Sequence, residues 1–263
     1  MTPMRTPSPH GATLRGLDQI AHLDAPERKQ GYVNTMFDII APAYDTFTTL
    51  FSFGMDKIWK NELVGLIKPH VRLDADLLDL ACGTGDLAYA LARLAPRGRM
   101  LGIDASPGMI AMANRGMAER MAAITCAVRF EVGDMCSLQL PDVSQDLVSV
   151  GYGLRNVPKL DDAISEIARV LRPHGLCACL DFSLPEPGWW RVIFLRYLQV
   201  MGNVYGLAMH GEADVYGYIA RSIERFVGWR ELSRRFEAHG LTVLEARPKL
   251  NDGVCLHLVR KKP

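Results

Sequence analysis

The residues best suited to chemistry form a turn in which two glycines lie close to acidic side chains. The segment reads Leu77-Leu78-Asp79-Leu80-Ala81-Cys82-Gly83-Thr84-Gly85-Asp86-Leu87-Ala88. Its apolar first half is typical of a strand that is buried on both faces. Gly83 and Gly85 let the backbone approach a ligand where a Cβ would collide, and a helix that begins at Asp86 would point free N–H groups at the same place. The segment therefore predicts a cofactor site at a strand-to-helix turn.

Two kinds of cofactor fit this turn. The pattern Gly83-x-Gly85-x-x-Ala88, with Asp104 about 20 residues further on, matches the dinucleotide fingerprint. Asp79 argues against a dinucleotide, because a carboxylate near the turn would repel the pyrophosphate. S-adenosylmethionine carries a sulfonium and an ammonium group and no phosphate, so Asp79 could face its charged end while Asp104 binds the ribose hydroxyls. We therefore expect S-adenosylmethionine, with a nicotinamide dinucleotide as the alternative.

Two more residues should border the same site. Asp134 ends the third predicted strand as Asp104 ends the second, so both carboxylates should reach one edge of the sheet. Asp134 is expected to accept a hydrogen bond from the adenine amine; the alternative is that it only caps the Met135-Cys136 turn. Cys82 also borders the turn, but no neighbouring residue would stabilise a thiolate, so we expect no nucleophilic role for it.

Composition excludes several classes of protein. The chain has 263 residues, of which 49% are hydrophobic and 22% charged, which is enough for one substantial core. Its formal net charge of +1 gives no reason to expect a nucleic-acid partner. The 6 cysteines include no C-x-x-C pair, which favours buried thiols over disulfides or a metal site. No apolar stretch reaches the roughly 18 residues of a membrane helix. We therefore expect a cytoplasmic protein without a transmembrane segment, with at most peripheral membrane contact.

Strand and helix patterns alternate after the glycine turn, which predicts an α/β protein with a mostly parallel, twisted sheet and helices on both faces. A closing helix and strand pair should follow. The expected strands are Arg99–Asp104, Val128–Gly133, Leu147–Gly151, Leu176–Phe182, Thr242–Arg247 and Val254–Val259, and the expected helices are Pro107–Met121, Leu160–Leu171 (ended by Arg172-Pro173-His174-Gly175) and Trp229–His239.

The remaining segments should surround this core within a single domain, residues 28–263. Residues 1–27 are expected to form a flexible tail, and residues 28–70 a helical cap over the carboxyl ends of the strands. Tyr44 and Asp45 of this cap should close the pocket; the alternative is an ordinary core aromatic and a solvated aspartate. The cofactor-binding core is expected at 71–182, a lid insertion at 183–228 and the closing elements at 229–263. Within the insertion, Trp189–His210 is apolar on nearly all sides, so it should be covered by the rest of the domain, by a second subunit of a homodimer or by a hydrophobic substrate. We predict a helical lid over a hydrophobic acceptor pocket; simple packing on the sheet is the alternative.

Further motifs are rarer than the glycine turn. They are Phe37-Asp38-x-x-Ala41-x-x-Tyr44-Asp45, Ser52-Phe53-Gly54 with Trp59-Lys60, Gly153-Leu154-Arg155-Asn156-Val157, Arg169-Val170-Leu171-Arg172-Pro173-x-Gly175 and Asp214-x-Tyr216-x-Tyr218. With these motifs, the chain from about Val33 onward resembles S-adenosylmethionine-dependent methyltransferases, and more narrowly the ubiquinone/menaquinone biosynthesis C-methyltransferases. The resemblance implies a Rossmann-like methyltransferase fold with an N-terminal helical cap and a helical lid inserted after the fifth strand.

The resemblance also implies roles for individual residues. Thr84, Asp104 and the pair Asp134-Met135 should contact the cofactor, and Gly151 lies where the family usually has a contacting serine. The chain departs from the family on the substrate side: Thr48 replaces Asn, Asp56 replaces His, Arg221 replaces Glu and Val227 replaces Pro. The other cofactor-binding residues that we expect are Tyr44, Asp79, Gly83, Gly85 and Ala105, and the expected substrate-binding residues are Asp56, Tyr152, Tyr205, Tyr216 and Arg221.

Methylation of a hydroquinol ring carbon requires alignment, exclusion of water and loss of a phenolic proton. Arg155 is the residue expected to stabilise the developing oxyanion, with Asn156 holding it or a water; a structural ion pair is the alternative for Arg155. Because a guanidinium is a poor base, the proton should pass to water, Asp45 or His210. His210 could instead be an ordinary surface or core histidine.

The function predicted from these residues is methyl transfer from S-adenosylmethionine to a ring carbon of a hydrophobic quinol- or phenol-type acceptor. The departures near the substrate leave two alternatives open: a C- or O-methyltransferase acting on a polyketide or another aromatic compound, and a repurposed protein that binds the cofactor without consuming it. A nicotinamide-dependent dehydrogenase would share the glycines and Asp104.

Overall fold

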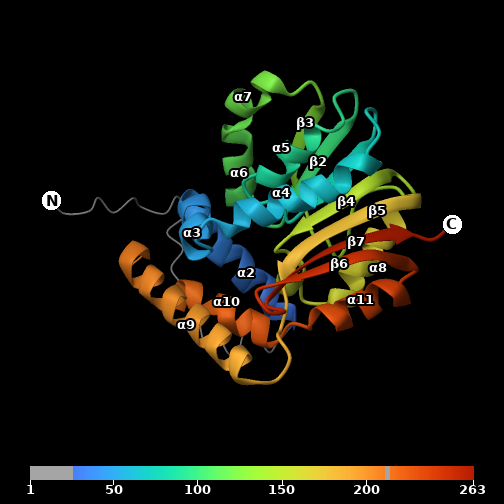
Figure 1. Ribbon diagram of the computed structural model, residues 1–263. Helices are drawn as coiled ribbons and strands as arrows, with labels where there is room; N and C mark the ends of the chain where they lie inside the picture. Colours follow the sequence, from blue (N-terminus) through green and yellow to red (C-terminus); the bar gives the residue numbers. More distant parts are fainter. Residues whose placement is uncertain (1–25, 211–213) are drawn as a thin grey trace.

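The apolar runs of the sequence form one seven-stranded sheet in a computed structural model that describes residues 26–210 and 214–263 (Figure 1). The strand order is β3-β2-β1-β4-β5-β7-β6, and β7 is antiparallel to both of its neighbours while β1 to β5 run parallel. The predicted α/β fold with a closing strand pair is confirmed. The strands are β1 Asp76–Leu80, β2 Arg99–Asp104, β3 Ala127–Val132, β4 Gln145–Gly151, β5 Leu171–Phe182, β6 Leu241–Lys249 and β7 Val254–Lys261.

Helices cover both faces of the sheet. On one face α4 and α5 pack through residues such as Leu63 and Tyr89, and on the other α8 and α11 pack through Ile164 and Phe236. The helices are α2 Pro26–Ile40, α3 Tyr44–Phe51, α4 Met55–Ile67, α5 Asp86–Ala92, α6 Pro107–Arg115, α7 Met117–Arg120, α8 Leu160–Val170, α9 Trp189–His210, α10 Asp214–Glu224 and α11 Trp229–Ala238. Short 3₁₀ turns occupy Ala41–Ala43, Lys68–His70, Met121–Ala123 and Leu154–Asn156.

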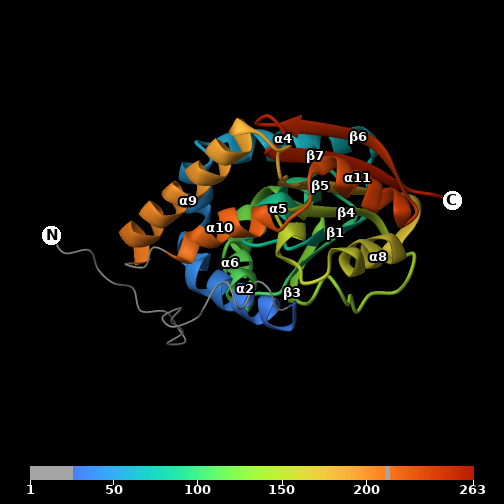
Figure 2. The ribbon, with the colours of Figure 1, turned by 90° about the horizontal axis from the view of Figure 1, so that it is seen from below.

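A separate helical layer lies at the carboxyl end of the parallel strands. Figures 1 and 2 show α2, α3, α9 and α10 gathered at this end of the sheet. Met36 of α2 packs in one buried cluster with Phe194 of α9 and Tyr218 of α10. The N-terminal cap and the insertion after β5 therefore support each other, although they are far apart in the sequence.

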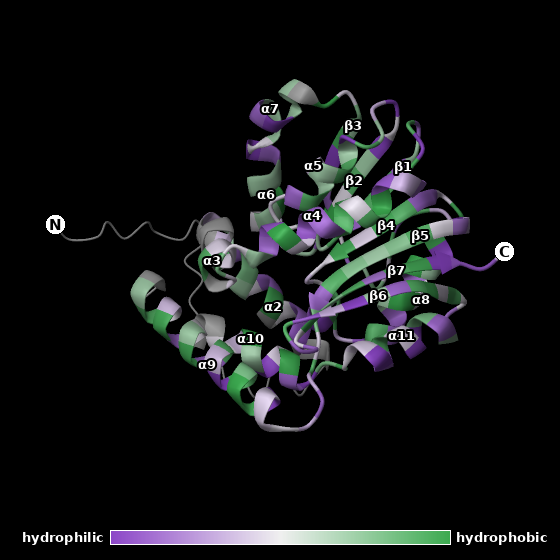
Figure 3. Ribbon diagram, in the orientation of Figure 1, coloured by the Kyte–Doolittle hydropathy of each residue, from purple (hydrophilic) through white to green (hydrophobic). Residues whose placement is uncertain are grey.

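Within residues 26–210 and 214–263, helix α9 is covered on one side only. Phe194 and Leu198 are buried, whereas the opposite side keeps apolar side chains exposed, as the green stretches along α9 in Figure 3 illustrate. No helix within the described ranges is long and apolar enough to cross a membrane. The exposed apolar residues of α9 are Trp189, Val192, Ile193, Val200, Val204 and Leu207.

Two predicted boundaries were wrong. The helix expected to run from Pro107 to Met121 ends at Arg115, because the chain tightens at Gly116, whose N–H bonds to the carbonyls of both Met112 and Asn114. The strand expected to begin at Leu176 begins at Leu171: Leu171 already pairs with Gln145, and the residues up to Leu176 form a bulge before the ladder resumes at Leu147. The Arg172-Pro173-His174-Gly175 sequence does follow the end of α8 at Val170, as predicted, but it lies within β5, because a bulge adds residues to one strand without ending the pairing.

Candidate active site

The turn between β1 and α5 is built from left-handed residues. Ala81, Gly83 and Gly85 have φ values of 51°, 55° and 86°. A Cβ on Gly83 would meet only Cε1 of Tyr44 at 4.0 Å, so this position opens into a cavity, whereas a Cβ on Gly85 would lie 2.8 Å from Cζ of Phe130. The two glycines therefore differ in their surroundings: at Gly83 the backbone is open to a cavity, whereas at Gly85 the missing Cβ lets the turn pack on the sheet.

Asp104 holds the turn in place. One carboxylate oxygen accepts from the N–H of Gly83 and the other from the N–H of Ser106, both at 2.9 Å. Burial raises the pKa of Asp104 above its ordinary value, although the two backbone N–H groups oppose the shift. Each oxygen keeps a further lone pair, so Asp104 can still accept hydrogen bonds from a ligand.

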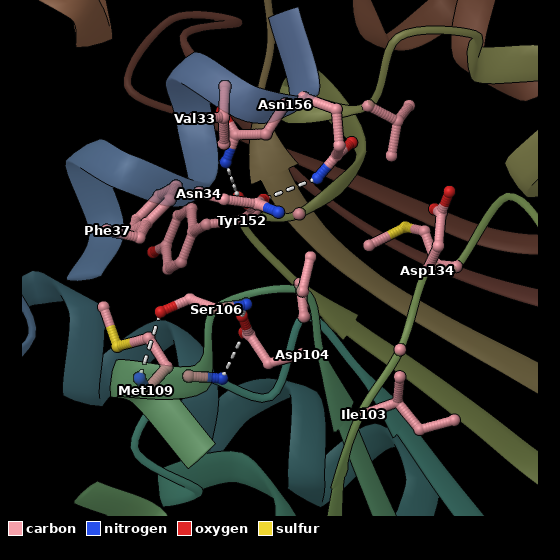
Figure 4. Close-up of a pocket in the computed structure, with 18 of the residues that line it drawn as sticks. Val33, Asn34, Phe37, Ile103, Asp104, Ser106, Met109, Asp134, Tyr152 and Asn156 are labelled. Carbon is pink, nitrogen blue, oxygen red and sulfur yellow. Dashed lines mark hydrogen bonds between the residues drawn. The ribbon is translucent and has the colours of Figure 1, made fainter. Parts of the chain in front are cut away.

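A cavity of about 630 Å³ opens beside this carboxylate. Figure 4 shows Asp104 and Ser106 on one side of it and Phe37, Tyr152 and Asn156 facing them from the other. Asp134 lines the cavity as predicted, while its side chain also accepts from the N–H of Cys136 at 2.8 Å. The contact with Cys136 is the capping geometry of the alternative interpretation, and it leaves the second carboxylate oxygen for a ligand. Ala105, Met135, Gly151 and Asn34 complete this part of the lining.

Asp79 lies in an adjoining cavity of about 380 Å³ on the other side of the glycine turn. It is 1% exposed, and its Oδ1 accepts from Oγ of Ser149 at 2.6 Å. Its Oδ2 has no hydrogen-bond partner in the described part of the chain. Burial raises the pKa of Asp79 to about 7. Thr84 and the ammonium-bearing Lys60 line the same cavity. An unpaired carboxylate oxygen and a lysine beside a glycine turn fit a ligand that carries both an ammonium and a carboxylate group.

A third cavity, of about 590 Å³, is mostly apolar and lies between the sheet and the helical layer. Tyr44 and Tyr152 line all three cavities, so the three meet around these two rings. We call the third one the acceptor cavity. Its lining consists of Met36, Phe37, Ile40, Tyr44, Thr48, Ser52, Asp56, Trp59, Tyr152, Arg155, Phe182, Tyr218 and Ile219.

Arg155 enters the acceptor cavity from the 3₁₀ turn after β4. Its Nη1 donates to Oδ1 of Asp181 at 3.1 Å and to the carbonyl of Tyr152 at 2.6 Å, and its guanidinium lies 5.0 Å from the ring centroid of Phe182. Its Nε has no partner among the described residues. The ion pair that was the alternative for Arg155 is therefore present, and the N–H of Nε is still unused.

The turn that carries Arg155 is tied down on both sides. Asn156 donates to the carbonyl of Tyr152 at 3.2 Å and accepts from the hydroxyl of Tyr218 at 3.1 Å. Lys29, on α2, donates to the carbonyls of Arg155 and Val157 at 3.1 and 2.8 Å. Burial, followed by the charge of Arg155, lowers the pKa of Lys29 to about 8. The N-terminal cap thus positions the Arg155 turn directly.

The structure assembles most of the predicted residues but not all of them. Tyr205 packs in the helical layer and Arg221 lies on α10, and neither belongs to the lining of the three cavities described here. None of the α9 side chains that the structure describes lines the acceptor cavity; Tyr218 and Ile219 of α10 supply that wall. The side chains of Asp45, His210 and Tyr216 lie outside the described residues.

Several residues of the site were missed by sequence reasoning. Lys60 had a usable signal, because it follows Asp56 by four positions on one helix. Ser149 had none, since its contact with Asp79 depends on the pairing of β4 with β1, which places the two residues opposite each other. Tyr218 and Lys29 reach the site only through the packing of α10 and α2.

Comparison with known proteins is consistent with this geometry. The ubiE/COQ5 methyltransferase family matches residues 25–261. A ubiquinone/menaquinone biosynthesis C-methyltransferase of Methylobacterium nodulans is 32% identical over 87% of this chain and 90% of its own length. A demethylmenaquinone methyltransferase of Listeria monocytogenes is 31% identical over 82% of this chain and 90% of its own length.

Solved structures with low identity share the fold. An S-adenosylmethionine-dependent methyltransferase of Aquifex aeolicus is 16% identical, with a TM-score of 0.51 over 72% of this chain and 84% of its own. A methyltransferase of Methanosarcina mazei is 20% identical, with a TM-score of 0.55 over 75% of this chain and 97% of its own. The [4+2]-cyclase SpnF is 23% identical, with a TM-score of 0.51 over 76% of this chain and 80% of its own.

Proposed function

Because the chain belongs to the ubiE/COQ5 methyltransferase family, we propose that it transfers a methyl group from S-adenosylmethionine to a ring carbon of a hydrophobic quinol- or phenol-type acceptor. The observation that carries this proposal is the junction at Tyr44 and Tyr152. There, the cavities around the glycine turn meet an apolar cavity that holds a buried arginine. The names of the two relatives, which refer to quinone biosynthesis and to demethylmenaquinone, support an acceptor of this class.

Individual residues would hold S-adenosylmethionine through its three polar regions. Asp104 would accept from the ribose hydroxyls, and Asp134 from the adenine amine. Asp79 Oδ2 would face the ammonium group, and Lys60 the carboxylate, because both line the cavity that adjoins the turn. Thr84, Ala105, Met135 and Gly151 would supply the remaining contacts. When bound, the cofactor supplies an electrophilic methyl group on its sulfonium.

The acceptor cavity would position the ring and stabilise its negative charge. A buried guanidinium donor such as Arg155 Nε can bind an oxyanion strongly, because little water competes for it. Asp181 and Asn156 would keep the guanidinium and its turn oriented. The aromatic lining would hold the ring close to the reacting methyl group and exclude water.

Calorimetry and product analysis test the proposal. S-adenosylmethionine should bind to the purified protein and NADH should not. S-adenosylhomocysteine should then form in the presence of demethylquinols with short or long prenyl tails, and mass spectrometry with carbon NMR should locate the new methyl group on the ring. Binding of NADH alone would contradict the cofactor assignment. If the protein methylated other phenols but none of the demethylquinols, the acceptor would be another aromatic compound and not a quinol.

A further inference from the structure

Two polar atoms in the acceptor cavity are unusual, because each is buried and neither has a hydrogen-bond partner in the described ranges. They are Oδ1 of Asp56 and Nε of Arg155, on side chains that are both 5% exposed. Buried polar groups almost always have a partner, and an unpaired one is costly. A ligand that donates one hydrogen bond and accepts another would satisfy both atoms. We have assigned the Arg155 donor to the developing oxyanion, which leaves the role of Asp56 open.

The surroundings of Asp56 fix its side chain and leave one oxygen free. Asp56 lies in the first turn of α4, where its N–H donates to Oγ of Ser52 at 3.2 Å. Its Oδ2 pairs with Nζ of Lys60 at 2.9 Å, one helical turn further on. Burial acts to lower the pKa of Lys60, but the charge and hydrogen bond of Asp56 outweigh it, and the net pKa is raised. The ion pair with Lys60 occupies Oδ2 of Asp56, and Oδ1 is left to a ligand in the cavity.

The other titratable groups around the cavity are poorer proton acceptors. Burial raises the pKa of Tyr44, and burial with the nearby Asp56 carboxylate raises the pKa of Tyr152 well above its usual range, so both phenols stay protonated. Arg155 and Lys60 carry their protons already. Among the described residues of this lining, Asp56 is the one carboxylate.

We propose that Oδ1 of Asp56 accepts the hydrogen bond of the acceptor hydroxyl and then takes its proton. This inference rests on the proposed methyl transfer. As the O–H bond breaks, its electron pair raises the electron density of the ring, and the new C–C bond forms while the electrons of the C–S bond return to sulfur. The methylated ring carbon then loses its hydrogen to solvent as a proton, and Asp56 returns its proton to the oxygen. One proton is released in the whole reaction.

The first test compares Asp56→Asn with the unaltered protein on two phenols of similar shape, one with an ordinary hydroxyl and one acidic enough to be ionised at pH 7. We expect kcat of Asp56→Asn to fall about 100-fold or more on the weakly acidic phenol and less than about 5-fold on the ionised one, because the second needs no base. The loss of kcat on the weakly acidic phenol should become smaller as the pH rises, because more of that phenol is then already ionised. Cofactor affinity should stay within about 3-fold by calorimetry. Equal losses on both phenols, or a change in KM alone, would overturn the proposal.

Glu62→Gln is the matched control for this variant. Glu62 lies on the same helix and pairs with Arg247 and Lys249, away from the cavities. The Glu62→Gln variant therefore lacks a carboxylate of α4 and its ion pairs, but the change does not affect the contacts of the acceptor. Its kcat should be unchanged on both phenols, and a loss equal to that of Asp56→Asn would mean that the effect is structural.

A binding measurement decides the matter even without turnover. With S-adenosylhomocysteine bound, the protein should prefer a phenol over its methyl ether by about 10-fold or more, because only the phenol can donate to Asp56. Asp56→Leu should remove this preference. An unchanged preference would refute the contact with Asp56. If the unaltered protein shows the preference but methylates no ring compound, the proposed function fails and the contact stands.

Discussion

Oδ1 of Asp181, near the end of β5, lies 3.1 Å from Nη1 of Arg155, in the turn that follows β4. Both side chains are nearly inaccessible to water, and the other oxygen of Asp181 accepts from the N–H of Arg155 at 3.3 Å. Burial raises the pKa of Asp181, and the arginine opposes the shift. The Asp181 carboxylate thus connects the end of β5 with the turn after β4, because it accepts hydrogen bonds from both the backbone and the side chain of Arg155.

This relationship predicts what removal of Arg155 does. Arg155→Ala should lower turnover by roughly 10²- to 10³-fold, because the donor to the developing oxyanion is lost. It should also cost about 3–5 kcal/mol in the free energy of unfolding, since Asp181 is left buried without its partner. Arg155→Lys separates these effects, because it keeps the charge and loses the fork of donors. Steady-state kinetics with calorimetric cofactor titration is the check; turnover within a few fold of the unaltered protein would dismiss the electrostatic role.

Asp79→Asn should weaken cofactor binding and stabilise the ligand-free protein. The variant keeps the contact to Ser149 and removes the buried charge, so affinity should fall roughly 10- to 100-fold. The free energy of unfolding at pH 8 should rise by on the order of 1–3 kcal/mol. In the unaltered protein, affinity should increase as the pH rises through about 7, where Asp79 ionises. Titrations from pH 5.5 to 8.5 check this, and equal affinity of the two proteins would contradict the assignment of Asp79.

The two glycines of the turn should respond differently to alanine. Gly83→Ala adds a Cβ that meets no protein atom closer than 4.0 Å, so it adds only the backbone strain of its φ of 55° and should weaken cofactor binding more than it weakens the fold. Gly85→Ala places a Cβ 2.8 Å from Phe130 at a φ of 86°, so it should cost about 1–3 kcal/mol of stability. Thermal unfolding beside calorimetry distinguishes them; identical behaviour of the two variants would mean that Gly83 does not face the ligand.

His257 predicts an acid-sensitive fold. It is buried beside Ser233 and Phe236, and burial lowers its pKa to about 4 although the carbonyl of Trp229 opposes the shift. The unfolded chain then binds a proton that the native state excludes between about pH 4 and 6.5, so stability rises with pH across this window, by at most about 3 kcal/mol. His257→Gln should remove this rise, whereas the exposed His174→Gln should not. Urea unfolding at several pH values is the measurement.

Asp79 has the opposite effect in nearly the same window. Its raised pKa means that the native state holds a proton that the unfolded chain has lost, so this group lowers stability as the pH rises from about 4 to 7. The two slopes should partly cancel in the unaltered protein. In His257→Gln, the pH dependence of the free energy of unfolding should therefore show the contribution of Asp79, and in Asp79→Asn that of His257. The double variant should show neither contribution.

The sequence predicted the parts of the site that are local. A strand-to-helix turn needs glycines at fixed offsets, and Asp79 and Asp104 lie at or near the ends of two strands, so the turn and the neighbouring carboxylates could be placed together from the sequence. Contacts that depend on packing were not predictable in the same way. Ser149 reaches Asp79 through strand register, and Lys29, which is 126 residues before Arg155, reaches its turn through the packing of α2.

The acceptor cavity shows the same limit. The apolar pattern of Trp189–His210 indicated that this helix must be covered, but it did not identify the covering element. Periodicity shows which face of a helix is buried and not what packs against that face. In the structure α10 forms that wall of the cavity and α9 packs outside α10, with part of its surface exposed. Whether α9 closes over a bound acceptor stays a prediction, and fast hydrogen exchange in α9 with both ligands bound would count against it.

The position of Tyr44 and Tyr152 in the lining of all three cavities has a thermodynamic consequence. Under the proposed function each ring would contact both ligands, so a shift of either ring would change two equilibrium constants at once. Coupling between binding sites is reciprocal: the factor by which an acceptor analogue changes the dissociation constant of the cofactor must equal the factor by which the cofactor changes that of the analogue. A dissociation constant measured for the cofactor is therefore defined only when the occupancy of the acceptor cavity is stated, and the converse holds for the acceptor analogue.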